Sequence, residues 1–397
     1  MGSERIFADH AAGSPVRSEV VELLATLYRD GIGNPNGGHA EARRARALLD
    51  EARATIAEAF EVEPRQVTFT GSASEALALA LCSELSDTGS LLTTATEHRG
   101  ARALANRHQA AGGSVELIPV SASGAWRLED LHPRAHTVGL LAISSGELGT
   151  EQNVQALRGV LPDADFGALI LDGVQAAASR ALQFSETGAT HLVIGSAKLE
   201  GPAGIAALLS APDRHLKPLV PGGGQERGRR GGTEAVPLAA AFAHAVRLSV
   251  QEREVTRRHL SALSAAFDNA LGAPEAHGLR PTGPADRTNR LPGHHSYAAN
   301  WALGDDLVAA LDHAGLAIST GSACISGSRE PSEALAACGL SDDESRGGIR
   351  ISFGRTNSID EAVRAAAIVA ASCERVRVPA RPPAPGDLDG DAVLRGA

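Results

Sequence analysis

The chain has 397 residues, a formal net charge of −10 and 43% hydrophobic residues. This length suffices for a large core and favours two or more domains, while the acidic balance argues against direct nucleic-acid binding. The sequence has no run of 18 apolar residues, and its start lacks a basic region followed by an apolar one. We therefore expect neither a membrane span nor a signal peptide, but a cytoplasmic protein.

The first half of the chain alternates between helical and strand patterns. Helices are predicted over residues 15–28 and 40–60, separated by a loop that Gly31, Gly33 and Asn34-Pro35 impose. Further helices are predicted over 71–84 and 97–111. Strands are predicted over residues 66–70, 91–94, 115–119, 137–143, 168–171 and 191–194. This alternation predicts an α/β fold with a mostly parallel sheet covered on both faces.

The second half predicts a bridge to a smaller domain. The glycine-rich stretch 221–233 lacks the Gly-Lys-Ser/Thr ending of a P-loop, so a flexible turn is one interpretation. A long helix over 237–269 leads to an α+β pattern that runs from Trp301 onward. We predict a large domain over 13–255, a small domain made of 1–12 plus 256–377, and a proline-rich disordered tail over 378–397.

One lysine and one aspartate follow two of the predicted strands. Lys198 comes shortly after the apolar run 191–194, and Asp172 closes the run 168–171. Lys198 could be a surface side chain whose stem alone is buried, and Asp172 could cap a helix. A second interpretation is a pyridoxal phosphate (PLP) site, in which a lysine holds the aldehyde as a Schiff base and an acid keeps the pyridine nitrogen protonated.

The four cysteines are Cys82, Cys324, Cys338 and Cys373, and none forms a C-x-x-C pair. A zinc ribbon or a thioredoxin-like motif is therefore unsupported, and we expect no metal site. Cys324 lies between Gly-Ser-Ala and Ile-Ser-Gly, a small-residue context in which a loop can move. The other three cysteines fall in helical patterns, where a buried, unreactive thiol is expected.

Several ordered motifs together resemble the NifS/IscS-type cysteine desulfurases, in the class V aminotransferase group of fold-type I PLP enzymes. The motifs are Gly33-Asn34-Pro35, Thr96-Glu97-His98, Asp172 with Gln175, Lys198, the glycine-rich stretch that ends at Thr233, Gly321-Ser322-Ala323-Cys324, and Gly348 to Arg355. The resemblance extends from Asp9 to about Ile368. It implies the fold-type I architecture, PLP as the cofactor and L-cysteine as the substrate.

The resemblance also implies a role for each matched position. Lys198 would carry PLP, Asp172 would pair with the pyridine nitrogen, Gln175 would bond the ring hydroxyl, and His98 would stack on the ring and move protons. Ala73, Ser74 and Ser196 would bind the phosphate, which suits the N-terminus of a helix. Thr233 would reach the phosphate in the partner subunit of a homodimer. Arg350, with Asn34, would bind the substrate, and a fork from Arg350 would hold its carboxylate.

The implied reaction converts L-cysteine to L-alanine and leaves a persulfide on Cys324 for an acceptor protein that the sequence does not identify. Three positions depart from the family pattern. Ala197 stands where the family has a histidine, and Gly146 stands where it has an asparagine. Gly195 stands where the family has a serine, and the nearest serine here, Ser196, comes one position later. Each lost hydrogen bond would weaken binding by about 1–3 kcal/mol. Two alternatives therefore stay open: a related PLP-dependent carbon–sulfur or selenocysteine lyase, and a degenerate partner protein without activity.

Overall fold

The computed structural model describes residues 5–131, 137–160, 167–321 and 330–377. A seven-stranded sheet lies at its centre, with the strand order β2-β8-β7-β6-β5-β3-β4. The strands β3 to β7 form parallel pairs, as expected from the alternating pattern. The strands of this sheet are β2 (Val67–Thr70), β3 (Ser90–Thr93), β4 (Ser114–Leu117), β5 (Val138–Ala142), β6 (Ala168–Asp172), β7 (His191–Gly195) and β8 (Ala206–Ser210).

The strand β8 is absent from the sequence-based prediction. It inserts between β2 and β7 and runs antiparallel to both. Only ten residues separate the end of β7 from the start of β8, and such a short connection permits an antiparallel pair but not a parallel one. The sheet is therefore mixed although mostly parallel, and the predicted α/β fold is confirmed.

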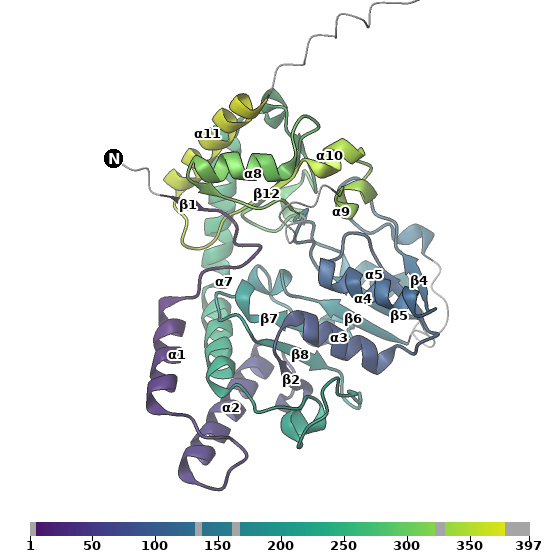
Figure 1. The fold of residues 1–397 in the computed structure, drawn as a ribbon, viewed down its shortest axis with the longest axis vertical. Helices are drawn as coiled ribbons and strands as arrows, with labels where there is room; N and C mark the ends of the chain where they lie inside the picture. The colour runs from purple at the N-terminus through teal and green to yellow at the C-terminus, as the bar shows by residue number, and fades with distance from the viewer. Residues whose placement is uncertain (1–4, 132–136, 161–166, 322–329, 378–397) are drawn as a thin grey trace, which may run out of the picture.

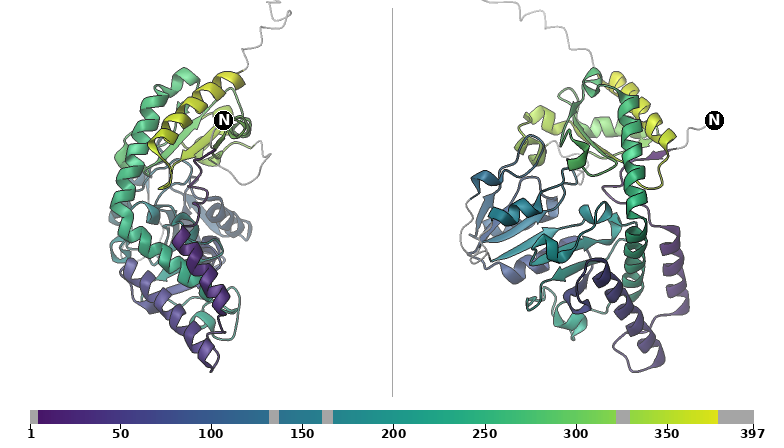
Figure 2. Two further views of the ribbon diagram at one scale, coloured as in Figure 1. Left: turned by 90° about the vertical axis from the view of Figure 1, so that its left-hand side faces the viewer. Right: turned by 180° about the vertical axis from the view of Figure 1, so that it is seen from behind.

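Alternation along each strand divides the apolar residues between two faces of the sheet. In β6, Ala168 and Ile170 pack beneath α3 (Ala73–Glu84) and α4 (Arg99–Ala110), whereas Leu169 and Leu171 face the opposite side. That opposite side is covered by α2 (Ala40–Ala59) and the first half of α7 (Val236–Leu271). Figures 1 and 2 show these two helical layers. The expected coverage of both faces is thus present.

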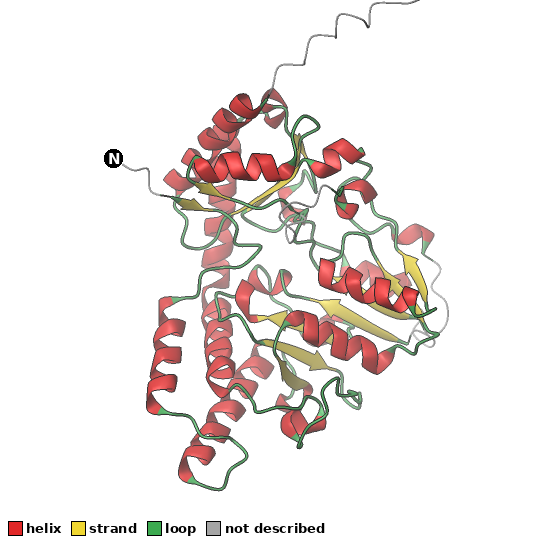
Figure 3. Cartoon of the chain, in the orientation of Figure 1, coloured by secondary structure: helices red, strands yellow, loops and turns green. Residues whose placement is uncertain are grey.

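The helix α7 connects two separate hydrophobic cores. Its residues Val236 to Val246 pack against the large sheet, and Leu260 to Leu271 pack in a second core. The helix α1 (Ser18–Asp30) packs beside α7. Figure 3 shows α7 running along the molecule behind both groups of strands. A single long helix therefore sets how the two cores are spaced.

The second core is built on short strands and two helices. It contains a three-stranded sheet of β9 (Arg280–Pro281), β10 (His294–Ala298) and β12 (Gly348–Ser352), with a separate parallel pair of β1 (Ile6–Phe7) and β11 (Leu316–Ala317). The N-terminal residues Ile6 and Ala8 pack here, against residues from the other end of the chain. The helices α8 (Gly304–His313) and α11 (Ile359–Val376) pack in this core beside α7. The short helices α9 (Glu333–Ala337) and α10 (Asp342–Arg346) contribute no residue to it, and Leu335 of α9 packs in a small cluster with Leu148 and Ala298.

Two short helices, α5 (Val154–Val160) and α6 (Phe184–Thr187), complete the described elements. The domain boundary predicted at residues 255 and 256 falls inside α7 and stays a prediction. The predicted tail, 378–397, lies outside the described residues. Among the helices that the structure describes, none is long and apolar enough to cross a membrane.

Candidate PLP site

Lys198 and Asp172 lie at the carboxyl ends of neighbouring parallel strands. Asp172 is the last residue of β6 and pairs in register with Val193 of β7, and Lys198 ends a short turn that follows β7 directly. The Asp172 side chain is buried, and its Oδ1 accepts a hydrogen bond of 2.9 Å from the backbone N–H of Val174. Ligands of open α/β sheets bind at this edge, so the fold presents both groups where a cofactor would bind.

His98 joins these two groups from a third strand end. It precedes α4, and its Nδ1 accepts a hydrogen bond of 3.1 Å from the backbone N–H of Gly100. Burial lowers the pKa of His98, and Lys198 lowers it further while Asp172 opposes the change. Burial likewise raises the pKa of Asp172, against the positive charges of His98 and Lys198. The amine, the carboxylate and the imidazole therefore share one electrostatic environment.

The N-terminus of α3 lies beside this group. Ser74 is exposed in the first turn of α3, and a Cβ on Gly100 would lie only 3.0 Å from its Oγ. The first turns of α3 and α4 are therefore adjacent, and free backbone N–H groups at helix N-termini favour phosphate. Ala73 and Ser74 begin α3 beside the end of α4 that carries His98, and their role toward the phosphate stays a prediction.

These residues fit PLP by their chemistry. Burial raises the pKa of Asp172, so a further positive charge beside it would stabilise the carboxylate form. A protonated pyridine nitrogen would supply that charge. Lys198 offers the amine for the aldehyde, and the helix N-terminus offers N–H donors for the phosphate. Each part of the cofactor thus has a matching group on one edge of the sheet.

An N-terminal segment covers the lysine, which sequence reasoning did not predict. The Lys198 ammonium donates a hydrogen bond to the carbonyl oxygen of Ala12, and Gln175 Nε2 donates one of 2.8 Å to that of Ala11. The backbone N–H of Ser14 donates to the carbonyl of Ala197. These contacts use backbone carbonyls of residues more than 160 positions away, so no side-chain motif signals them.

Arg350 occupies the other side of the site, on β12, and is already engaged. Its guanidinium is buried and forms an ion pair of 2.7 Å with Asp9 and a hydrogen bond of 3.0 Å to the carbonyl of Gly146. His294 also bonds that carbonyl, at 3.1 Å. A Cβ on Gly146 would lie 3.1 Å from Gln175 Nε2, so Gln175 occupies space close to this backbone. The missing side chain at Gly146 thus leaves room for Gln175.

Glu147 marks where the predicted cysteine loop begins. Its Oε1 accepts a hydrogen bond of 2.5 Å from the Ser332 hydroxyl, and a Cβ on Gly321 would meet its Cγ at 2.5 Å. Burial raises the pKa of Glu147, although Arg350 lowers it. Cys324 itself lies outside the described residues. Glu147 was not predicted as a site residue, because glutamate side chains are mostly exposed and no local pattern marks this one as buried.

Three predicted positions lie apart from Lys198 or face another way. Asn34 and Thr233 are exposed, and the Asn34 Oδ1 accepts a hydrogen bond from Asn36 in the loop between α1 and α2. The Ser196 hydroxyl is fully buried against Gly201 and has no hydrogen-bond partner in the described part of the chain. The roles predicted for these residues stay predictions.

Of the remaining cysteines, Cys82 and Cys373 lie in the helices α3 and α11 as predicted, whereas Cys338 directly follows α9. Cys338 and Cys373 are buried, and burial raises the pKa of each thiol to about 11. Cys82 is only partly buried, and its sulfur accepts a hydrogen bond of 3.3 Å from the Arg107 guanidinium of α4. No cluster of metal-binding side chains occurs within the described ranges, which leave out residues 322–329.

Comparison with known proteins agrees with this geometry. The profile of the family described as aminotransferase class-V matches residues 6–364. The chain is 30% identical to cysteine desulfurase IscS 1 of Archaeoglobus fulgidus, over 94% of this chain and 97% of that protein. It is 32% identical to a cysteine desulfurase of a Frankia species, over 94% and 92%.

Solved structures extend the comparison to the fold. A structure of a NifS-like protein superposes with a TM-score of 0.85 at 24% identity, over 94% of this chain and all of that chain. A structure of SspA in complex with cysteine superposes with a TM-score of 0.74 at 27% identity, over 89% and 99%. With its lysine, aspartate and histidine at the expected strand ends, this chain belongs to the class V aminotransferase family and is a PLP-dependent cysteine desulfurase.

Proposed function

We propose that Lys198 carries PLP in this cysteine desulfurase, with Asp172, Gln175 and His98 around the ring and with Ala73, Ser74 and Ser196 toward the phosphate. The observation that carries the proposal is the placement of Lys198, Asp172 and His98 after β7, β6 and β3, whose carboxyl ends share one edge of the sheet. When bound, PLP supplies an electron sink for chemistry at the substrate α-carbon.

The protein groups have distinct tasks in this proposal. Asp172 holds a proton on the pyridine nitrogen, because a buried carboxylate is stabilised as an anion only beside a cation. His98 has a lowered pKa, so its imidazole is neutral near pH 7 and can accept a proton from the substrate. Arg350 binds the substrate carboxylate together with Asn34. Because the guanidinium carries five N–H donors, it can keep its bond to Asp9 and still bind a carboxylate.

Cys324 is the proposed sulfur acceptor. Its thiolate takes the sulfur atom of L-cysteine as a persulfide, the carbon–sulfur bond breaks, and L-alanine leaves with a proton in place of the sulfur. The sequence Gly321-Ser322-Ala323-Cys324, which matches the cysteine motif of the family it resembles, supports this assignment. The persulfide then passes to an acceptor protein.

The proposed active unit is a cytoplasmic homodimer. Thr233 is exposed at the end of the glycine-rich stretch, which suits a contact with the cofactor phosphate of a partner subunit. Asn34 is exposed in the same manner. Among the described contacts, neither Thr233 nor Asn34 touches the site around Lys198 in its own chain. In the proposed dimer, each would contact the site of the partner subunit.

The test compares three variants in the presence of L-cysteine. Lys198→Ala should lose the PLP absorbance band. Cys324→Ala should keep the band and still respond to L-cysteine, yet release no sulfide with a reductant present. The matched control is Cys82→Ala, a partly buried cysteine outside the site, which should behave as the unmodified protein. If Cys324→Ala released sulfide at the unmodified rate, the protein would be a simple carbon–sulfur lyase.

A further inference from the structure

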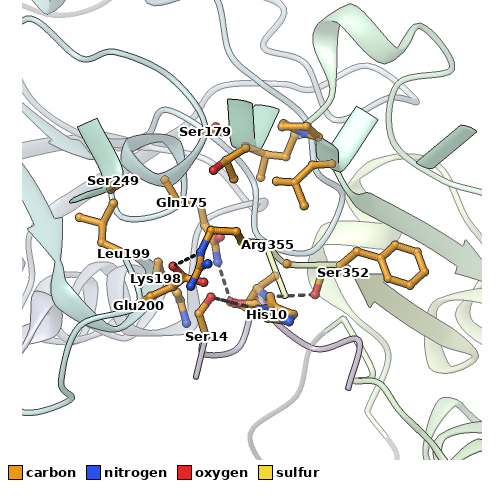
Figure 4. A pocket seen from close by; sticks show the side chains of 18 of the residues that line it. His10, Ser14, Gln175, Ser179, Lys198, Leu199, Glu200, Ser249, Ser352 and Arg355 are labelled. Atoms are coloured by element: carbon orange, nitrogen blue, oxygen red, sulfur yellow. Dashed lines mark hydrogen bonds and ion pairs between the residues drawn. The ribbon is translucent and has the colours of Figure 1, made fainter. Parts of the chain in front are cut away.

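A cavity that Lys198 borders lies between the two cores and is lined by residues of both. It encloses about 100 Å³ and is bordered by the N-terminal segment, the turn after β7, the α7 helix and the end of β12. Figure 4 shows His10, Ser14, Gln175, Lys198 and Arg355 around it. Of the predicted cofactor and substrate residues in the described ranges, Lys198 and Gln175 border this cavity, whereas His98, Asp172 and Arg350 do not.

One stripe of α7 faces the cavity. Ser249, Arg253, Thr256 and Leu260 all line it, and they follow one another at intervals of four, three and four residues. This spacing places their side chains on a single face of the helix. Arg253 is therefore directed to the cavity by the helix periodicity, between two hydroxyl groups.

Arg253 has no partner among the residues that the structure describes. Its Nε is buried without a hydrogen bond, and none of the described carboxylates forms an ion pair with its guanidinium. Burial alone lowers its pKa. A partly buried guanidinium usually has a carboxylate or another acceptor, because removing the charge from water is unfavourable.

The carboxylates nearby are already shared by two other arginines. Glu200 pairs with Arg17 at 2.5 Å and with Arg355 at 3.0 Å. Glu252 pairs with Arg17 at 2.8 Å and lies 4.0 Å from Arg355. Three guanidinium groups thus stand against two carboxylates, before the Lys198 ammonium is counted. This cavity carries an excess of positive charge.

We propose that the cavity binds a small oxyanion, with Arg253 as its principal ligand and the hydroxyls of Ser249 and Thr256 as further donors. The volume of about 100 Å³ is well above what a single water needs, and it suits a tetrahedral oxyanion or a short carboxylate. A guanidinium fork binds two oxygens of such an anion at once. The bound anion would contact the side chains of α7 that line the cavity, and it would lie between the two cores.

Isothermal titration of the PLP-saturated protein tests this proposal. Inorganic phosphate, sulfate and acetate are titrated separately at constant ionic strength set with chloride, so that the phosphate-binding side of the PLP site is already filled. We expect one saturable site per chain for at least one of these anions. Binding of phosphate or sulfate alone identifies an inorganic oxyanion, and binding of acetate identifies a carboxylate.

Two variants on the same helix separate a specific site from general charge. Arg253→Gln should weaken binding about tenfold or more, because it removes the fork. Arg258→Gln removes the same charge five residues away, where the side chain is 69% exposed and paired with Glu254, and should keep the affinity within about twofold. Neither variant should change the PLP absorbance. The proposal is overturned by the absence of saturable binding, by unchanged binding in Arg253→Gln, or by an equal loss in Arg258→Gln.

Discussion

Replacing Glu226 by glutamine should destabilise the protein strongly, because Glu226 neutralises a buried arginine. Its carboxylate accepts two hydrogen bonds from Arg53, at 2.7 and 2.8 Å, and one of 2.9 Å from the backbone N–H of Phe69. The Arg53 and Glu226 side chains are only 5% and 3% exposed. The pair joins α2, the edge strand β2 and the glycine-rich stretch.

The magnitude follows from what remains after the substitution. In Glu226→Gln the guanidinium keeps its bond to the Val67 carbonyl and one neutral amide oxygen, but no negative charge. Breaking a buried pair in this way lowers the free energy of unfolding by about 3–5 kcal/mol. Glu226 and Arg227 also adopt left-handed backbone angles, with φ of 47° and 58°, which are unfavourable for side-chain-bearing residues and persist only while other contacts hold them.

Urea unfolding with PLP at fixed concentration measures the effect, and the unfolding slopes show whether the transitions are comparable. The control is Glu254→Gln, which removes an exposed partner of Arg257 and should change stability by less than about 1 kcal/mol. A double variant, Arg53→Met with Glu226→Gln, should lose less stability than the sum of the single variants. If Glu226→Gln stays within about 1 kcal/mol of the unmodified protein, the structural reasoning is wrong.

Three further predictions concern pH, thiols and assembly. Burial raises the pKa of Glu97 to about 8, so the folded state keeps a proton that the unfolded chain loses from about pH 4.5 upward. The free energy of unfolding should therefore fall as the pH rises from about 4.5 to about 8, and Glu97→Gln should reduce this fall, as measured by urea midpoints. An equal slope in the variant would contradict this. Cys338 and Cys373, with pKa values near 11, should resist alkylation of the folded protein at pH 8, as mapped by peptide mass spectrometry. Thr233→Ala should weaken PLP retention in a protein that sediments as a dimer; a monomer that keeps full PLP would refute the shared site.

Local sequence patterns were sufficient for the main architecture. The period of two in runs such as residues 168–172 separates two buried faces, and the spacing of strands and helices indicates a parallel sheet. Lys198 and Asp172 could be located because each follows an apolar strand, and parallel strands present their carboxyl ends at one edge. The order of several motifs then identified the family.

Only the tertiary structure determined how distant segments complete the site. Asp9 meets Arg350 across 341 positions, and Ala11 and Ala12 approach Gln175 and Lys198 through backbone carbonyls that every residue possesses. The antiparallel strand β8 depends on the return of the chain after β7. Within the part of the chain that the structure describes, Arg253 has no partner, while the nearby carboxylates of Glu200 and Glu252 pair with Arg17 and Arg355. Such features depend on which groups meet in space, whereas a sequence pattern records only which face of an element is buried.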